Sequence, residues 1–143
     1  MNKEQMKLAL RVKKHILKEH KSVIMDYFQK TAVFLKGLLG SGARYMASCG
    51  TVGCIAGHTC HIADGKWSNK SEDRATELLG LNWLEAKKLF YFSFSEYNSR
   101  DYFGAYEKER VALRSCKPGT KAYAKVVAAA IDRCIERNYK ENS

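Results

Sequence analysis

The residues with the most reactive side chains are gathered in one run, positions 49–64, which reads Cys-Gly-Thr-Val-Gly-Cys-Ile-Ala-Gly-His-Thr-Cys-His-Ile-Ala-Asp. Three cysteines and two histidines alternate here with small residues, and the run contains no Lys, Arg or Glu. Such side chains serve as metal ligands, nucleophiles or bases, and glycine lets a ligand approach the backbone. The run therefore predicts a ligand site, and three kinds of chemistry fit it.

The first kind is anion binding at the start of a helix, which the pattern predicts from about residue 52 to residue 64. The first amides of a helix lack partners within it, and the helix dipole makes them attractive to phosphate. No Gly-Lys-Ser/Thr ending follows, so the run is not a nucleotide-hydrolysing phosphate loop. In the competing interpretation, Thr51 only caps the helix and the glycines only allow close packing. The predicted ligand-binding residues are Gly50, Thr51, Val52, Gly53, Cys54 and His58, with Arg44 closing the site.

The second kind is a metal site. Cys54, His58 and His61 stand at i, i+4 and i+7, on one face of the predicted helix, and Cys49 lies just upstream. Two thiolates and two imidazoles make a valid tetrahedral zinc set. Four ligands from so short a run is an unusual layout, so we expect no metal and no other cofactor, and keep zinc as the alternative.

The third kind is a cysteine nucleophile. Cys49 or Cys54 near a helix start would have a lowered pKa, with His58 as its base. No third catalytic group is evident, and a cysteine in a cytosolic protein is usually a small buried residue. We therefore predict a protein that is not an enzyme.

The rest of the chain must position this run, and its composition predicts helices. The 143 residues include one proline and 10 glycines, and 45% of them are hydrophobic. We predict an all-α fold in which residues 1–143 form one compact domain of about five to seven short helices around a central small-residue helix. Caps and periodicity place the helices at 3–20, 52–64, 71–80, 82–92, 99–115 and 121–138, with shorter apolar segments at 23–29 and 31–39. The predicted caps include Gly80 at the end of the third of these helices, and Asn82 and Thr120 at the starts of the fourth and the last.

The charge is strongly basic, with a formal net value of +10. Residues 1–21 contain seven basic and two acidic side chains, so their net charge of +5 is half of the total. An excess of this kind favours anionic partners, although a stripe of charge is also the ordinary pattern of a solvated helix face. The stripe recurs at steps of three or four residues, at Lys3, Lys7, Arg11, Lys14, Lys18 and Lys21.

Membrane association is not expected. The apolar runs are short and interrupted by lysine, and the N-terminus is charged from residue 3 without an apolar signal core. The apolar face of the first helix also carries Lys13 and no aromatic residue. The predicted members of this face are Met6, Ala9, Leu10, Val12, Ile16 and Leu17. We expect a cytoplasmic protein.

A nucleic-acid interface is a further alternative. Residues 72–92 predict two helices joined at Gly80-Leu81, which is compatible with a helix-turn-helix. Antiparallel helix pairs of other kinds are far commoner. The second helix would present Asn82, Glu85, Lys87 and Lys88.

Residues 49–58 resemble a motif, Cys-Gly-Thr-x-x-Cys-x-x-Gly followed by an aromatic residue or histidine, of small proteins from bacteriophages, prophages and some bacteria. The resemblance covers about a third of the chain and implies a phage-type origin, hence the cytoplasm of a host cell, but no reaction. It extends to Ala75–Leu81, Glu85, Ala86, Leu89 and Phe90.

These observations predict a non-catalytic, phage-type accessory protein that binds an anionic, nucleotide-like ligand at the glycine-rich helix start. Its most specific form is counter-defence, in which the partner is an anionic small molecule or a host defence component. The first alternative is an inhibitor that binds nucleic acid or a host protein through its basic surface. The second is a structural zinc domain, and self-association into a homo-oligomer stays open.

Overall fold

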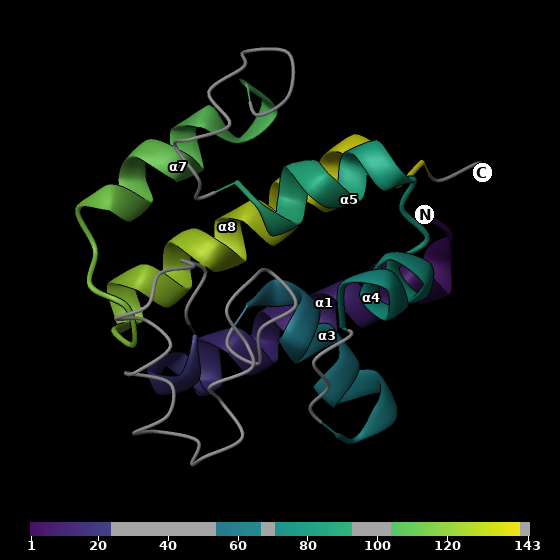
Figure 1. The fold of residues 1–143 in the computed structure, drawn as a ribbon, viewed down its shortest axis with the longest axis horizontal. Helices are drawn as coiled ribbons and strands as arrows, with labels where there is room; N and C mark the ends of the chain where they lie inside the picture. The colour runs from purple at the N-terminus through teal and green to yellow at the C-terminus, as the bar shows by residue number, and fades with distance from the viewer. Residues whose placement is uncertain (24–53, 67–70, 93–103, 141–143) are drawn as a thin grey trace.

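A computed structural model describes residues 1–23, 54–66, 71–92 and 104–140 of the chain. Over these residues the fold is all-helical and contains no strand, which confirms the predicted class (Figure 1). The described α-helices are α1 (Lys3–Lys18), α3 (Ile55–Asp64), α4 (Ser71–Leu79), α5 (Trp83–Phe90), α7 (Glu107–Arg114) and α8 (Lys121–Asn138). Two 3-10 turns are η1 (His20–Ser22) and η4 (Gly104–Tyr106).

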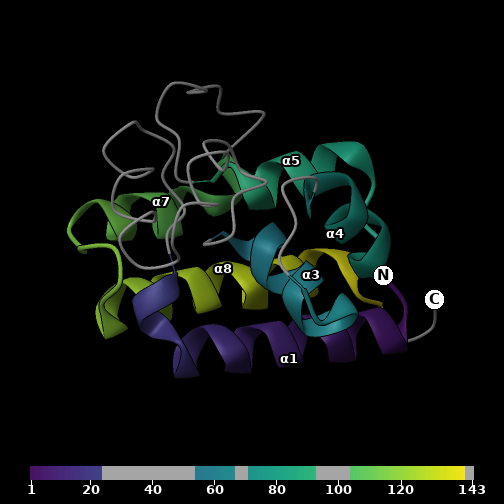
Figure 2. The ribbon, with the colours of Figure 1, turned by 60° about the horizontal axis from the view of Figure 1, so that its bottom comes forward.

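The two longest described helices, α1 and α8, pack against each other in antiparallel directions. The terminal ammonium of Met1 donates to the carbonyl of Asn138 at 3.3 Å. At the other end of the pair, the amide of Gly119 donates to the carbonyl of Val23 at 3.4 Å. Figure 2 shows α1 along the lower edge of the molecule, with α8 and α3 on one side of it. The opposite side of α1 faces away from these helices.

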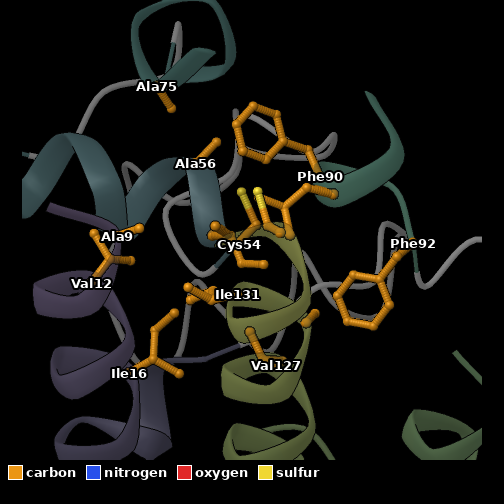
Figure 3. Packing of buried hydrophobic residues seen from close by; sticks show 14 of the residues in the cluster. Ala9, Val12, Ile16, Cys54, Ala56, Ala75, Phe90, Phe92, Val127 and Ile131 are labelled. Atoms are coloured by element: carbon orange, nitrogen blue, oxygen red, sulfur yellow. The ribbon is translucent and has the colours of Figure 1, made fainter. Parts of the chain in front are cut away.

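The predicted small-residue helix forms as α3. It packs against α1 and α4, and six consecutive residues, Ile55 to Cys60, are buried. The small side chains of Ala56 and Cys60 let the neighbouring helices come close, and Figure 3 shows Ala56 and Cys54 in the core beside α1 and α8. The predicted start at residue 52 is wrong, because Cys54 has an extended backbone (φ −91°, ψ 175°) and α3 begins at Ile55.

Local capping chemistry explains most of the other helix boundaries. Asn2 and Gln5 form a capping box at the start of α1, with hydrogen bonds of 2.9 and 2.7 Å. Thr120 caps α8 through the amide of Tyr123, as predicted. Gly80 ends α4 with φ +64°, and a Cβ there would collide with the Gln5 side chain. Glycine at position 80 thus serves both the turn and the contact of α4 with α1.

Some predicted boundaries fall elsewhere or are not described. The sequence predicted a helix over 99–115, whereas the described part of it, α7, begins at Glu107 and ends at Arg114 after the turn η4. The helix predicted to reach residue 92 ends at Phe90. The predicted short helices at 23–29 and 31–39 lie outside the described residues, apart from the buried Val23.

Candidate functional site

Two of the predicted ligand-binding residues, Cys54 and His58, are described, and both are completely buried. Neither side chain therefore meets solvent in this structure, so a ligand that contacts them has to enter the core. The other predicted residues, Arg44 and 50–53, lie outside the described residues.

The side chain of Cys54 does not cap the start of α3. Cys54 is the N-cap residue and its side chain accepts no hydrogen bond from the first turn, while the amide of His58 makes the first intrahelical bond, to the Cys54 carbonyl at 3.0 Å. The amides of Ile55, Ala56 and Gly57 thus have no partner within the helix, as at any helix start. The competing prediction, that Thr51 caps this helix, concerns a residue outside the described ranges.

His58 belongs to a histidine cluster that sequence reasoning missed. Its Nδ1 atom lies 3.0 Å from Nδ1 of His15 on α1, and its Nε2 atom lies 3.4 Å from the carbonyl oxygen of Ser22. Because the carbonyl only accepts, Nε2 of His58 carries the proton, and His15 donates to Nδ1 of His58. The ring of His61 lies 5.4 Å from the ring of His15. The cluster links α1 and η1 to α3.

Burial disfavours the charged forms of His58 and His15. Desolvation, followed by the charge of His15, lowers the pKa of His58 from 6.5 to about 3. Desolvation, followed by the charge of His61, also lowers the pKa of His15. In the same helix, desolvation and then the charge of Asp64 raise the pKa of the Cys60 thiol to about 11. The Cys60 thiol is therefore protonated at neutral pH, whereas a nucleophilic cysteine needs the opposite shift.

The three described residues of the alternative zinc set, Cys54, His58 and His61, are not placed to bind one metal ion together. Among the described residues, no group of three or more His, Cys, Asp or Glu side chains is placed to hold a metal. Cys54, His58 and His61 therefore do not converge on one point, although all three lie at the predicted spacing. The fourth predicted ligand, Cys49, lies outside the described residues.

The six residues of the basic stripe are all exposed, and we call the stripe the basic face of α1. Lys13, the one lysine of α1 that points elsewhere, is bound to Asp132 of α8 at 2.8 Å. Within the stripe, Lys7 makes an exposed ion pair with Glu4 at 3.2 Å. The other members form no ion pair with any described residue. The basic face consists of Lys3, Lys7, Arg11, Lys14 and Lys18 of α1 and Lys21 of η1.

Two leucines border the basic face. The sequence assigned Leu10 and Leu17 to the apolar face of α1, but they are 42% and 40% exposed. The buried arc of α1 is narrower than predicted, because only Ala9, Val12 and Ile16 are fully buried there. A wider arc would have required another helix on that side, and no described element lies there (Figure 2).

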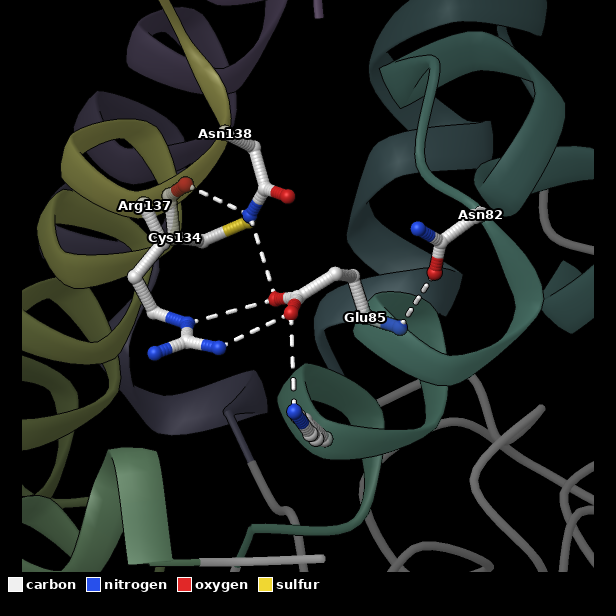
Figure 4. Close-up of polar contacts among 6 residues, drawn as sticks. Asn82, Glu85, Cys134, Arg137 and Asn138 are labelled. Atoms are coloured by element: carbon white, nitrogen blue, oxygen red, sulfur yellow. Dashed lines mark hydrogen bonds and ion pairs between the residues drawn. The ribbon is translucent and has the colours of Figure 1, made fainter.

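The predicted helix-turn-helix pair exists as α4 and α5, but its proposed DNA-reading residues make contacts within the protein. Glu85 binds Arg137 of α8 through two hydrogen bonds of 2.8 and 3.2 Å, and Lys88 lies 3.6 Å from Glu85 (Figure 4). Lys87 is paired with Glu72 of α4. Asn82 caps α5 by accepting from the Glu85 amide at 2.8 Å. Glu85, which the helix-turn-helix hypothesis assigned to DNA, therefore binds α8 instead.

A groove of about 380 Å³ runs between α7 and α8. The Glu109 carboxylate beside it is 5% exposed and accepts from Nε of Arg133 at 2.7 Å. Its second oxygen makes no hydrogen bond with a described residue and is itself buried, so a molecule in the groove does not reach it. The polar groups that line the groove are exposed lysines and carboxylates and the Arg133 guanidinium, which is already paired with Glu109.

Comparisons with protein-family models, with curated proteins and with solved structures find no match for this chain. The phage-type motif therefore stays a prediction. None of the described helices is long and apolar enough to cross a membrane.

Proposed function

We propose that this protein is a non-catalytic binding protein that recognises an anionic partner through the basic face of α1. The supporting observation is that all six cations of the stripe are exposed and only Lys7 has an ion-pair partner among the described residues. Such a row produces a positive potential that attracts an anionic surface and accelerates its association. In the phage-type, counter-defence form of the proposal, the partner is a component of the host cell.

The proposal requires that binding depends on the positive charge of the basic face, and not only on the net charge of the whole chain. Two charge-reversed variants separate these properties. Lys14→Glu with Lys21→Glu changes the basic face, whereas Lys108→Glu with Arg114→Glu changes exposed positions on α7. Both variants lower the net charge by the same amount.

The test is the salt concentration that elutes each variant from a heparin column, which presents a dense polyanion. We expect the α1 variant to elute at clearly lower salt than the wild type, and the α7 variant to shift much less. Equal shifts of the two variants would show that retention follows net charge alone, which contradicts the proposal.

A second candidate function places the anion elsewhere, as a nucleotide-like small molecule at the start of α3. Its supporting observation is the missing side-chain cap at Cys54, which leaves the amides of Ile55, Ala56 and Gly57 without an intrahelical partner. The ligand would then meet Gly50, Thr51, Val52 and Gly53 with Arg44, as the sequence predicted. Mass spectrometry of small molecules released by heating the purified protein tests it. A nucleotide-like ion supports this candidate, and a clean sample contradicts it.

A further inference from the structure

The exposed leucines of α1 recur in register with its lysines. Leu10 and Leu17 are seven residues apart, and each follows a lysine, Lys7 or Lys14, by three residues. Lys21 continues the spacing into η1. Seven residues are about two helical turns, so the leucines lie on one side of α1 about 10 Å apart, with the lysines beside them. The leucines thus form a short apolar strip along one side of α1, with a lysine of the basic face beside each leucine.

We propose that this surface is a docking site for an amphipathic helix of a partner protein, with an apolar seam flanked by acidic residues. The inference rests on the proposed function, since it specifies the anionic partner. A partner helix along α1 would cover Leu10 and Leu17, and removing their apolar area from water favours association. The carboxylates beside the apolar seam of the partner would pair with Lys7, Lys14 and Lys21. These ion pairs would make the surface selective for an acidic helix.

Charge and chemistry argue against two other occupants of this surface. A second copy of the chain would place the same cations against each other, which opposes a dimer through this face. A nucleic-acid backbone would pair with the lysines, but a row of phosphates offers the leucines no apolar contact. The exposed side chains of Leu10 and Leu17, at 42% and 40%, therefore fit a protein helix better than a duplex.

The test uses the full chain and a labelled peptide of about three heptads, with leucine at the a and d positions and glutamate at e and g. A peptide of the same composition in scrambled order is its control, and duplex DNA of about 20 base pairs is the competing ligand. Dissociation constants come from fluorescence anisotropy. The variants are Leu10→Ser with Leu17→Ser, the charge-reversed Lys14→Glu with Lys21→Glu, and Val111→Ser, an exposed control on α7.

We expect the heptad peptide to bind more tightly than its scrambled form. Both α1 variants should weaken this binding about tenfold or more, and Val111→Ser should not change it. Because the substituted leucines are exposed, circular dichroism should show that the variant remains folded. Failure of the heptad peptide to bind, or unchanged binding by the leucine variant, would overturn the docking inference.

The outcomes also separate this inference from the proposed function. Tight duplex binding that depends on Lys14 and Lys21 but not on Leu10 and Leu17 would leave the basic face as the binding surface and exclude the helix partner. If reversal of the lysines changes neither heparin elution nor peptide binding, the proposed function fails as well.

Discussion

Helix α1 has one face in the core and one in solvent. The polar side chains of the inner face have partners on other helices, whereas most of those on the outer face do not. On the inner face, Ala9, Val12 and Ile16 are buried, and Lys13 and His15 each contact a specific partner on α8 or α3. On the outer face, five of the six cations of the basic face have no ion-pair partner among the described residues. Burial demands a partner for each polar group, whereas water supplies one on the surface. We therefore expect the inner face to determine stability and the outer face to determine binding.

The sharpest test of this difference compares two neighbouring residues of α1. Ile16 is completely buried, whereas Leu17 is 40% exposed. We expect Ile16→Ala to lower the free energy of unfolding by about 3 kcal/mol, because it leaves a cavity in the core. Leu17→Ala should cost about 1 kcal/mol or less. Urea denaturation measures both, and equal losses would contradict the assignment of the two faces.

The histidine cluster should make the inner face sensitive to acid. The pKa of His58 is about 3 in the folded protein and 6.5 ordinarily, so the unfolded chain takes up the proton first. Stability is therefore complete above about pH 6.5 and falls as the pH falls toward 3. This histidine alone should cost about 2 kcal/mol at pH 5. A proton on Nδ1 of His58 would also replace its acceptor with a second donor facing His15.

Denaturation midpoints measured from pH 7 to pH 4.5 check this prediction, with His58→Gln as the comparison. The variant should be less stable at pH 7, but its stability should depend less on pH. A slope equal to that of the wild type would show that other groups cause the loss in acid.

The ion pair between Glu85 of α5 and Arg137 of α8 is partly buried, and it extends the comparison to these two helices. Burial alone would raise the pKa of Glu85, but the hydrogen bonds and charge of Arg137, with Lys88, outweigh it and lower the pKa. Glu85→Gln should therefore cost about 1–2 kcal/mol at pH 7. The contribution of the carboxylate should be complete above its ordinary pKa of 4.5 and be lost as the pH falls below 4.5 through the lower pKa of the folded protein. Glu77 is the control, because its pair with Arg74 is exposed and Glu77→Gln should cost less than about 0.5 kcal/mol. Thermal unfolding of both variants measures the difference.

The smallest effect on stability should come from the outer face itself. Lys14 is exposed and has no ion-pair partner among the described residues, so Lys14→Glu should change the free energy of unfolding by about 0.5 kcal/mol or less. The same substitution should still lower the salt needed to elute the protein from heparin. A large loss of stability would mean that the basic face has a structural role, and the comparison of the two faces would fail.

Local chemistry made several parts of the fold predictable. Thr120 and Asn82 cap their helices where the sequence placed them, and Gly80 ends α4 with a positive φ angle. Caps depend on residues only three or four positions apart, so a sequence contains the whole interaction. The start of α3 was misplaced because Cys54 is not a usual cap residue, and its extended backbone is not set by its own side chain.

The sequence did not predict contacts between residues that are far apart in the chain. His15 and His58 are 43 positions apart, and nothing in either local pattern indicates that their rings meet. The periodicity of α1 likewise suggested a wide apolar face that included Leu10 and Leu17. The width of the buried arc of a helix depends on how many other helices pack against it. The sequence of the helix alone does not contain that number.

The sequence by itself determined that the chain is helical, where most helices end, that a small-residue helix ends at Asp64, and that α1 carries a row of cations. These properties follow from propensity, capping and periodicity, which act over a few residues. Only the tertiary structure decided which side of α1 is covered, that His58 is neutral and paired with His15, and that Glu85 binds α8. Each of these depends on which helix excludes water from a given side chain, and that is settled when the helices pack together.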